Sequence, residues 1–223
     1  MNPDRKSWNG QQQELRRNLA HAEYFQKAIE LFLCQHAMVH TAKMSVAGLW
    51  SFEDEVLEGV SLQKMRLFPH NGDHSIAWIL WHMTRIEDVT MNLLVAGSPQ
   101  VMLQGGWLGR LKIKALDAGN AMTAAEMTEL SANIDLEALR SYRLAVGRRT
   151  REIVKLLEWD QLIRKVDPSR LQQLIMEKAV LEAASGLLDY WGGLTIAGLL
   201  LMPPTRHNFI HWNEVLRVKQ KIG

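Results

Sequence analysis

Hydrophobic residues recur along most of this 223-residue chain at the spacing of an α-helix. No stretch alternates hydrophobic and polar residues between flanking turns, as a β-hairpin would. The pattern predicts four long helices, over residues 22–44, 75–96, 136–159 and 205–221, with shorter helical pieces between them. We therefore expect an all-α fold, and four long helices with accessory pieces favour a four-helix bundle.

Capping and breaking residues define the expected helix ends. Asp73 or Ser75 is expected to cap the second helix and Gly97 to end it, while Pro203-Pro204 should break the chain before the last helix. Residues 97–120 are expected to form a long connection between helices 2 and 3, with at most one short helix. A connection of this length either has a function or covers the core.

No linker divides the sequence, so we expect a single domain over residues 1–223, with residues 1–21 as a peripheral N-terminal extension. The first segment lacks the apolar stretch of a secretory signal, and the most apolar run, 190–202, is shorter than the roughly 20 residues of a membrane span. These features predict a cytoplasmic protein that does not engage a membrane.

Composition narrows the function further. With 26 Lys+Arg against 24 Asp+Glu, the net charge of +2 supplies no general field for a polyanion, so no nucleic-acid partner is expected. A single cysteine, Cys34, excludes an intrachain disulfide and a zinc site built from a cysteine cluster. Any metal site must use other ligands.

A histidine pair near the start of the last predicted helix is the sharpest local feature. His207 and His211 are four residues apart, so on a helix both imidazoles point the same way and can share a metal ion. Two histidines make only a loose site, and His82, on the apolar face of the second predicted helix, is a candidate third ligand. A lone inward histidine is more often a hydrogen-bonded core residue, and this alternative remains open.

Two other pairs have the same spacing. His36 and His40 lie on the apolar face of the first predicted helix, whereas His70 and His74 span a turn-like segment. Spacing alone does not choose among the three pairs.

Three longer segments indicate a family. The runs GDHSIAWILWHMTRIEDVTMNLLVAG, LRSYRLAVGRRTREIV and GLLLMPPTRHNFIHWNEVLRVKQK resemble the DinB/YfiT-like superfamily of metal-dependent four-helix bundles, from about residue 22 onward. Members usually hold a divalent metal with one histidine of the second helix and an H-x-x-x-H pair of the fourth. The resemblance therefore implies His82, His207 and His211 as metal ligands. Characterised relatives include low-molecular-weight-thiol S-transferases and a mycothiol-dependent isomerase, but no motif here identifies a particular thiol.

Three neutral histidines leave at least one coordination position for a substrate atom or water, as in catalytic zinc sites. Zinc suits three imidazoles best, with nickel, iron and manganese as alternatives. The metal could activate a thiol that attacks a small electrophile, or activate water, so we expect a metal-dependent S-transferase or a hydrolase. The alternative is a non-catalytic helical protein whose histidines hold a structural metal or merely pack.

Neighbouring residues have two interpretations each. Arg85 and Arg206 could bind a carboxylate of the thiol or substrate, or form local ion pairs. Glu214 could orient His211, act as a base, or form a salt bridge. His36 and His40 could line the pocket, or fill ordinary buried polar positions.

The second and last predicted helices carry large apolar residues on more than one side, and this surplus needs burial. We therefore predict a homodimer that forms through these helix faces, although the accessory segments of the same chain could also provide the burial. The residues concerned are Leu80, Trp81, Phe209, Trp212 and Leu216.

Overall fold

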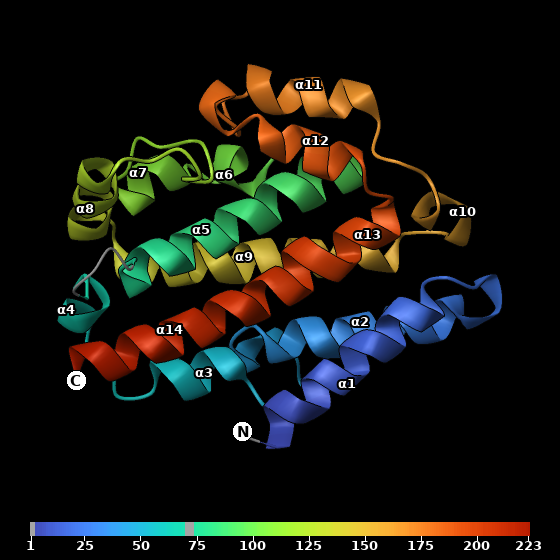
Figure 1. Ribbon diagram of the computed structural model, residues 1–223, viewed down its shortest axis with the longest axis horizontal. Coiled ribbons are helices and arrows are strands. Elements are labelled where there is room, and N and C mark those ends of the chain that lie inside the picture. The colour runs from blue at the N-terminus through green and yellow to red at the C-terminus, as the bar shows by residue number, and fades with distance from the viewer. Residues whose placement is uncertain (1–2, 70–73) are drawn as a thin grey trace.

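The computed structural model describes residues 3–69 and 74–223, and the regular elements within these ranges are all helices (Figure 1). An isolated antiparallel bridge between Lys165 and Thr195 is the one extended pairing recorded there. The all-α prediction is confirmed. Among these residues, no helix combines the length and apolar character needed to cross a bilayer.

The long helices form the frame of the molecule. They are α1 (Pro3–Asn18), α2 (Phe25–Met38), α5 (Ile76–Asp88), α8 (Ala124–Asn133), α9 (Leu136–Lys155) and α14 (Asn208–Ile222). Helix α5 packs against both α9 and α14, and α2 packs against α1 and α9 (Figure 1). The narrower prediction of a four-helix bundle is not settled by this packing and stays a prediction.

Shorter helices cover the frame. They are α3 (Phe52–Leu57), α4 (Leu62–Met65), α6 (Val101–Gln104), α7 (Trp107–Leu111), α10 (Trp159–Leu162), α11 (Pro168–Met176), α12 (Gly186–Gly192) and α13 (Ile196–Leu201). The connection predicted over residues 97–120 contains two short helices, α6 and α7, where no more than one was expected. Helix α8, which the hydrophobic pattern did not predict, begins at a capping box between Thr123 and Glu126.

Several predicted ends differ from the observed ones for local reasons. Helix α2 ends at Met38, and the carbonyl of Val39 accepts hydrogen bonds from side chains of α9 and α14 instead of continuing the helix. Helix α9 ends at Lys155 because Glu158 opens α10 with its own capping box. Ser75 caps α5, as predicted, by accepting from the backbone N–H of Trp78. The other predicted cap, Asp73, lies outside the described residues.

Two π-helical segments extend the helices that carry the candidate ligands. The segment η3 (Val89–Ala96) continues α5 to Gly97, whose left-handed conformation (φ 62°) ends the helix as predicted. The segment η5 (Met202–His207) joins α13 to α14, so Pro203-Pro204 widens the helix rather than breaking it. The last predicted helix is therefore the second half of a continuous helical stretch.

The N-terminal segment is not peripheral in the structure. Trp8 of α1 is fully buried and stacks on Phe209 of α14, with ring centroids 4.1 Å apart. Its indole donates to the carbonyl of Gln35, whose side chain donates back to the carbonyl of Trp8. The low hydrophobicity of residues 1–21 concealed this role, because only a few apolar residues are buried there, among them Leu15 and Leu19 as well as Trp8.

The surplus apolar residues of α5 and α14 are covered within this chain. Leu80, Trp81, Phe209 and Trp212 are all buried, and Leu216 is partly buried against the same core. The accessory segments thus provide the burial, and the homodimer stays a prediction without this support.

Candidate metal centre

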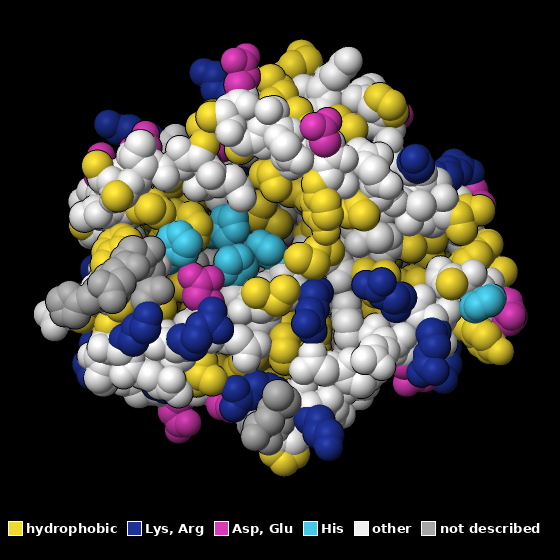
Figure 2. All heavy atoms as spheres, viewed as in Figure 1, with side chains coloured by type: hydrophobic (Ala, Val, Ile, Leu, Met, Phe, Trp, Pro, Cys, Tyr) yellow, Lys and Arg dark blue, Asp and Glu magenta, His cyan; other side chains and the backbone are white. Residues whose placement is uncertain are grey.

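The side chains of His82, His207 and His211 come together between α5 and the junction of η5 with α14. Each offers a ring nitrogen, and the three nitrogens lie within 4.8 Å of one another. The rings of His207 and His211 are 4.4 Å apart between centroids, and the ring of His82 is 5.2 and 5.1 Å from them. Figure 2 shows histidine side chains gathered in a hollow on this face, with acidic and hydrophobic side chains beside them.

The separation of two of these nitrogens suits a metal ion. The Nε2 atoms of His207 and His211 are 3.1 Å apart. Two nitrogens bound to a tetrahedral zinc at ~2.0–2.1 Å lie about 3.3 Å apart. The pair therefore needs only a small adjustment to share an ion, and in its absence one ring can donate to the other.

The connection after α7 fixes the ring of His82. The Nδ1 atom of His82 lies 2.5 Å from the carbonyl oxygen of Ala118, so Nδ1 carries the proton and Nε2 is left as a free lone pair. The carbonyl is presented by a tight turn in which the Asp117 side chain accepts from the N–H of Gly119. Gly119 has φ +83°, and a Cβ there would lie 2.6 Å from the Trp81 ring, so this turn requires glycine.

A carboxylate fixes the ring of His211 in a similar way. Its Nδ1 lies 2.7 Å from Oε2 of Glu214, one turn further along α14, which leaves Nε2 free to coordinate. Oε1 of Glu214 lies 2.9 Å from Nδ1 of His74. Burial tends to raise the pKa of the Glu214 carboxyl, but the hydrogen bonds from His211 and His74 outweigh it and lower this pKa. Of the roles expected for Glu214, the geometry shows orientation of His211.

Burial favours the neutral form of two of the candidate ligands, His82 and His207. Burial, reinforced by the neighbouring His211, lowers the pKa of His82 to about 3. Burial also lowers the pKa of His207 well below its ordinary value. Nδ1 of His207 is buried and has no hydrogen-bond partner among the described residues. A neutral imidazole is the form that binds metals, so the donor set fits a divalent cation.

Sequence reasoning missed the contribution of His74, which was considered only as a partner of His70. His70 lies outside the described residues. His74 stacks on Trp78 at 4.0 Å, and Trp78 stacks on His82 at 4.8 Å, so His74 stands beside the centre rather than in it. No sequence signal links His74 to Glu214, because the two are 140 residues apart.

The two arginines do not face the three histidines. Arg85 is fully buried and forms an ion pair with Asp88, which is the alternative that sequence analysis left open. It also donates to Gln100 and to the carbonyl of Leu116, so it holds the connection that presents Ala118. Arg206 donates to Asn9 of α1 and lines a separate cavity of about 690 Å³ between α1 and α13.

The remaining candidates, His36 and His40, do not line the hollow. Both are buried, and each has its Nε2 atom at a different oxygen of Glu87, at 2.8 and 3.0 Å. These three buried residues form a second group of ligand-type side chains. Glu87 was not singled out from the sequence, although an acidic residue in the same predicted helix as His82 was the available signal.

Comparison of the sequence with protein-family models gives no match. Comparison with curated proteins also gives no match. The resemblance to the DinB/YfiT-like superfamily therefore rests on the sequence segments quoted above and stays a prediction.

Proposed function

We propose that this chain is a metal-dependent enzyme of the DinB/YfiT-like type, in which His82, His207 and His211 hold one divalent ion, zinc by preference. The observation that carries the proposal is the arrangement of the free nitrogens. Two of the three rings are oriented by acceptors at Nδ1, and their Nε2 atoms face a common point with that of His207. Packed core histidines have no need of such an arrangement.

The reaction we propose is transfer of a low-molecular-weight thiol to a small electrophile, with hydrolysis by an activated water as the second candidate. When bound, the ion would lower the pKa of a thiol or water so that the conjugate base forms near neutral pH. His207 and His211 are partly exposed while His82 is buried, which leaves room for a fourth ligand on the side of the hollow.

The protein's own side chains would then handle the proton and the orientation. Because His74 donates from Nδ1 to Glu214, its Nε2 carries a lone pair that can accept the proton of the incoming thiol. The sulfur forms its bond to the electrophilic carbon, and a halide departs with its electron pair, whereas an opened epoxide or an enone keeps the pair and takes up a proton from water. Glu214 remains a carboxylate and keeps both histidines in place.

A screen of the zinc-loaded protein tests this proposal. We expect turnover with at least one of several biological thiols against a panel of halide, epoxide and enone electrophiles. His207→Ala and His211→Ala should abolish that turnover, whereas His21→Ala, at an exposed histidine of the N-terminal region, should retain it. Equal turnover in the wild type and the triple-alanine variant of the three histidines would contradict the proposal.

A further inference from the structure

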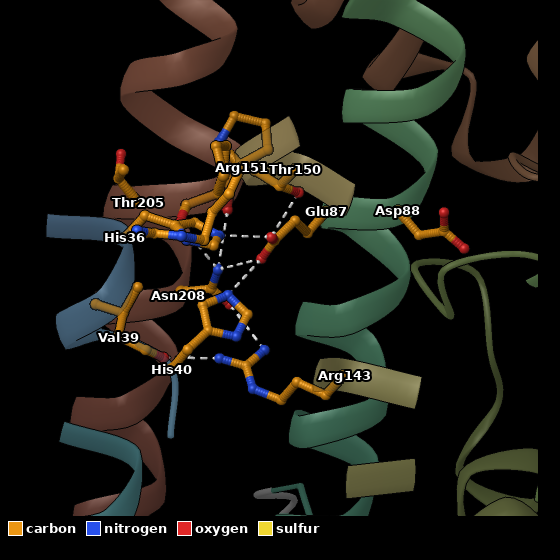
Figure 3. Close-up of polar contacts among 12 residues, drawn as sticks. His36, Val39, His40, Glu87, Asp88, Arg143, Thr150, Arg151, Thr205 and Asn208 are labelled. Atoms are coloured by element: carbon orange, nitrogen blue, oxygen red, sulfur yellow. Dashed lines mark hydrogen bonds and ion pairs between the residues drawn. The ribbon is translucent and has the colours of Figure 1, made fainter. Parts of the chain in front are cut away.

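Glu87 is a fully buried carboxylate that accepts four hydrogen bonds. Its Oε1 accepts from His36 at 2.8 Å and from Thr150 at 2.8 Å. Its Oε2 accepts from His40 at 3.0 Å and from Asn208 at 2.9 Å (Figure 3). Burial tends to raise the pKa of Glu87, but His40 and His36 outweigh it and hold this pKa well below its ordinary value.

These contacts join four parts of the fold at one point. Glu87 belongs to α5, and its partners come from α2 and the residues just after it, from α9 and from α14 (Figure 3). A buried charge of this kind stabilises a protein little compared with apolar packing, because its desolvation is costly. It does penalise strongly any arrangement in which the carboxylate loses its donors.

His36, His40 and Glu87 have the residue types of a metal site, but hydrogen bonding explains their contacts better than a shared metal ion does. Nδ1 of His36 and Nδ1 of His40 are both buried without a partner among the described residues. Each oxygen of Glu87 already accepts two hydrogen bonds, so the carboxylate has no lone pair left for an ion between the rings. With Nε2–H donated to Glu87, each Nδ1 is only an unused lone pair.

The network reaches the candidate metal centre through Asn208. This residue follows His207 directly, and Glu87 lies on the same helix as His82. Asn208 also donates to the carbonyl of Pro204 at 3.2 Å, and its Oδ1 accepts from Arg143 at 3.3 Å. The amide therefore ties the end of the π-helical turn, and the backbone of His207 with it, to α5 and α9.

We propose that Glu87 is a positioning residue for the three-histidine centre: by holding Asn208, it fixes the rotation and register of His207 and His211 relative to His82. This inference rests on the proposed function for its consequence in metal binding. It adds a role for a residue that does not contact the ion. It also assigns His36 and His40 as hydrogen-bond donors to Glu87 rather than as metal ligands.

A double-mutant cycle on zinc affinity tests the proposal. Glu87→Gln keeps the side-chain volume but replaces one acceptor oxygen by an NH₂ group, and Asn208→Leu removes the link from α14. Each should weaken zinc binding by about tenfold, the lower end of the effect known for groups that orient metal ligands. If Glu87 acts through Asn208, the double variant should be no more than about twofold weaker than either single variant.

Thr150→Val provides the matched control, because Thr150 donates to the same carboxylate from α9 and has no hydrogen bond to α14. It should change zinc affinity by less than about twofold even where its urea midpoint falls as far as that of Glu87→Gln. Equal losses of affinity in both variants would reduce Glu87 to a general stability role and overturn the proposal. Additive losses in the double variant would do the same.

A second readout does not depend on metal. In the metal-free protein, the ring ¹⁵N shifts of His207 and His211 report their Nε2 contact, and Glu87→Gln should move both while Thr150→Val moves neither. If the wild type bound no zinc, the proposed function would fail and these shifts alone would decide the positioning role. Two zinc ions per wild-type chain, one of them lost in His36→Ala, would overturn the assignment of His36 and His40 as hydrogen-bond donors to Glu87.

Discussion

At His211, the direction of one imidazole depends on a carboxylate three residues further along α14. Glu214 accepts from Nδ1 of His211 and also from Nδ1 of His74, which belongs to a distant part of the sequence. On the other side of the centre, a backbone carbonyl does the same for His82. The free nitrogens are thus selected by neighbours that are not themselves among the proposed metal ligands.

Replacing this carboxylate should therefore weaken metal binding. Glu214→Gln retains one acceptor oxygen for two donating histidines, so we expect zinc affinity to fall by about 10- to 100-fold. Competition with a chromophoric chelator measures the change. Glu152→Gln, at an exposed carboxylate paired with Arg149, should leave the affinity unchanged. An affinity for Glu214→Gln equal to that of this control would show that His211 needs no orienting partner.

The buried histidine His40 should make stability depend on pH. Burial, with the charge of Arg143 as a further cause, lowers its pKa from 6.5 to about 3 in the folded protein. Between these values the unfolded chain takes up a proton that the folded chain does not, so the free energy of unfolding falls as pH falls. The contribution is about 1.4 kcal/mol per pH unit below ~6.5.

Urea unfolding between pH 6.5 and 4.5 measures this slope. His40→Gln keeps an N–H donor for Glu87 but does not titrate, so its free energy of unfolding should fall less steeply than that of the wild type. Below about pH 4.5, Glu87 adds to the loss in both proteins, because its folded pKa is depressed. Parallel slopes for wild type and His40→Gln above pH 4.5 would show that His40 is protonated in the fold.

Sequence reasoning reached those residues whose signal is local. The pair His207 and His211 is visible as an i,i+4 spacing, and Glu214 follows on the same face. His74 and Glu87 were missed as partners because each meets its acceptor or donors across 47 to 140 residues of sequence. Such pairings depend on how the helices pack against one another, and hydrophobic periodicity does not encode that packing.

Among the elements, the junction of α13 and α14 shows how the sequence misled. Two adjacent prolines lack N–H groups and were expected to break the chain. Instead, the hydroxyl of Thr205 donates to the carbonyl of Leu200, which Pro204 cannot serve, and Gln12 of α1 donates to the carbonyl of Leu201. The helix therefore continues as a wider turn and delivers His207 at its end.

Removing the Thr205 hydroxyl should show how much its hydrogen bond stabilises this junction. Thr205→Val preserves the shape but leaves the buried carbonyl of Leu200 without that donor, so the free energy of unfolding should fall by about 1–2 kcal/mol. Thr128→Val is the control, because Thr128 makes the same kind of bond, to Ala124, on an exposed face. If urea unfolding gives the two variants equal losses, the bond at the junction contributes no more than a surface one.

For the whole molecule, the all-helical class followed from periodicity, whereas the place of the first helix did not. Residues 1–21 carry few apolar residues, yet Trp8 is enclosed between α2 and α14. Leu15 and Leu19 are buried with it, so a few widely spaced apolar residues provide the contact. This is why a peripheral extension was expected where the structure has a packed helix.

Truncating the Trp8 ring should destabilise the whole fold. Trp8→Ala leaves a cavity against Phe209 and removes the hydrogen bond to Gln35, so we expect the free energy of unfolding to fall by about 3–5 kcal/mol. Tyr24→Ala, at a half-exposed aromatic residue, should cost less than about 1 kcal/mol. A loss for Trp8→Ala as small as that of Tyr24→Ala would show that α1 contributes little to the stability of the fold, as expected of a peripheral extension.

Zinc K-edge X-ray absorption on the protein loaded with one equivalent of zinc tests the central claim most directly. The account predicts three imidazole ligands with zinc–nitrogen distances of ~2.0–2.1 Å and a further light-atom ligand from solvent. It also predicts that His82→Ala, His207→Ala and His211→Ala each remove one imidazole from the spectrum or abolish stoichiometric binding. Failure to bind zinc, or an unchanged imidazole count in any of these variants, would contradict it.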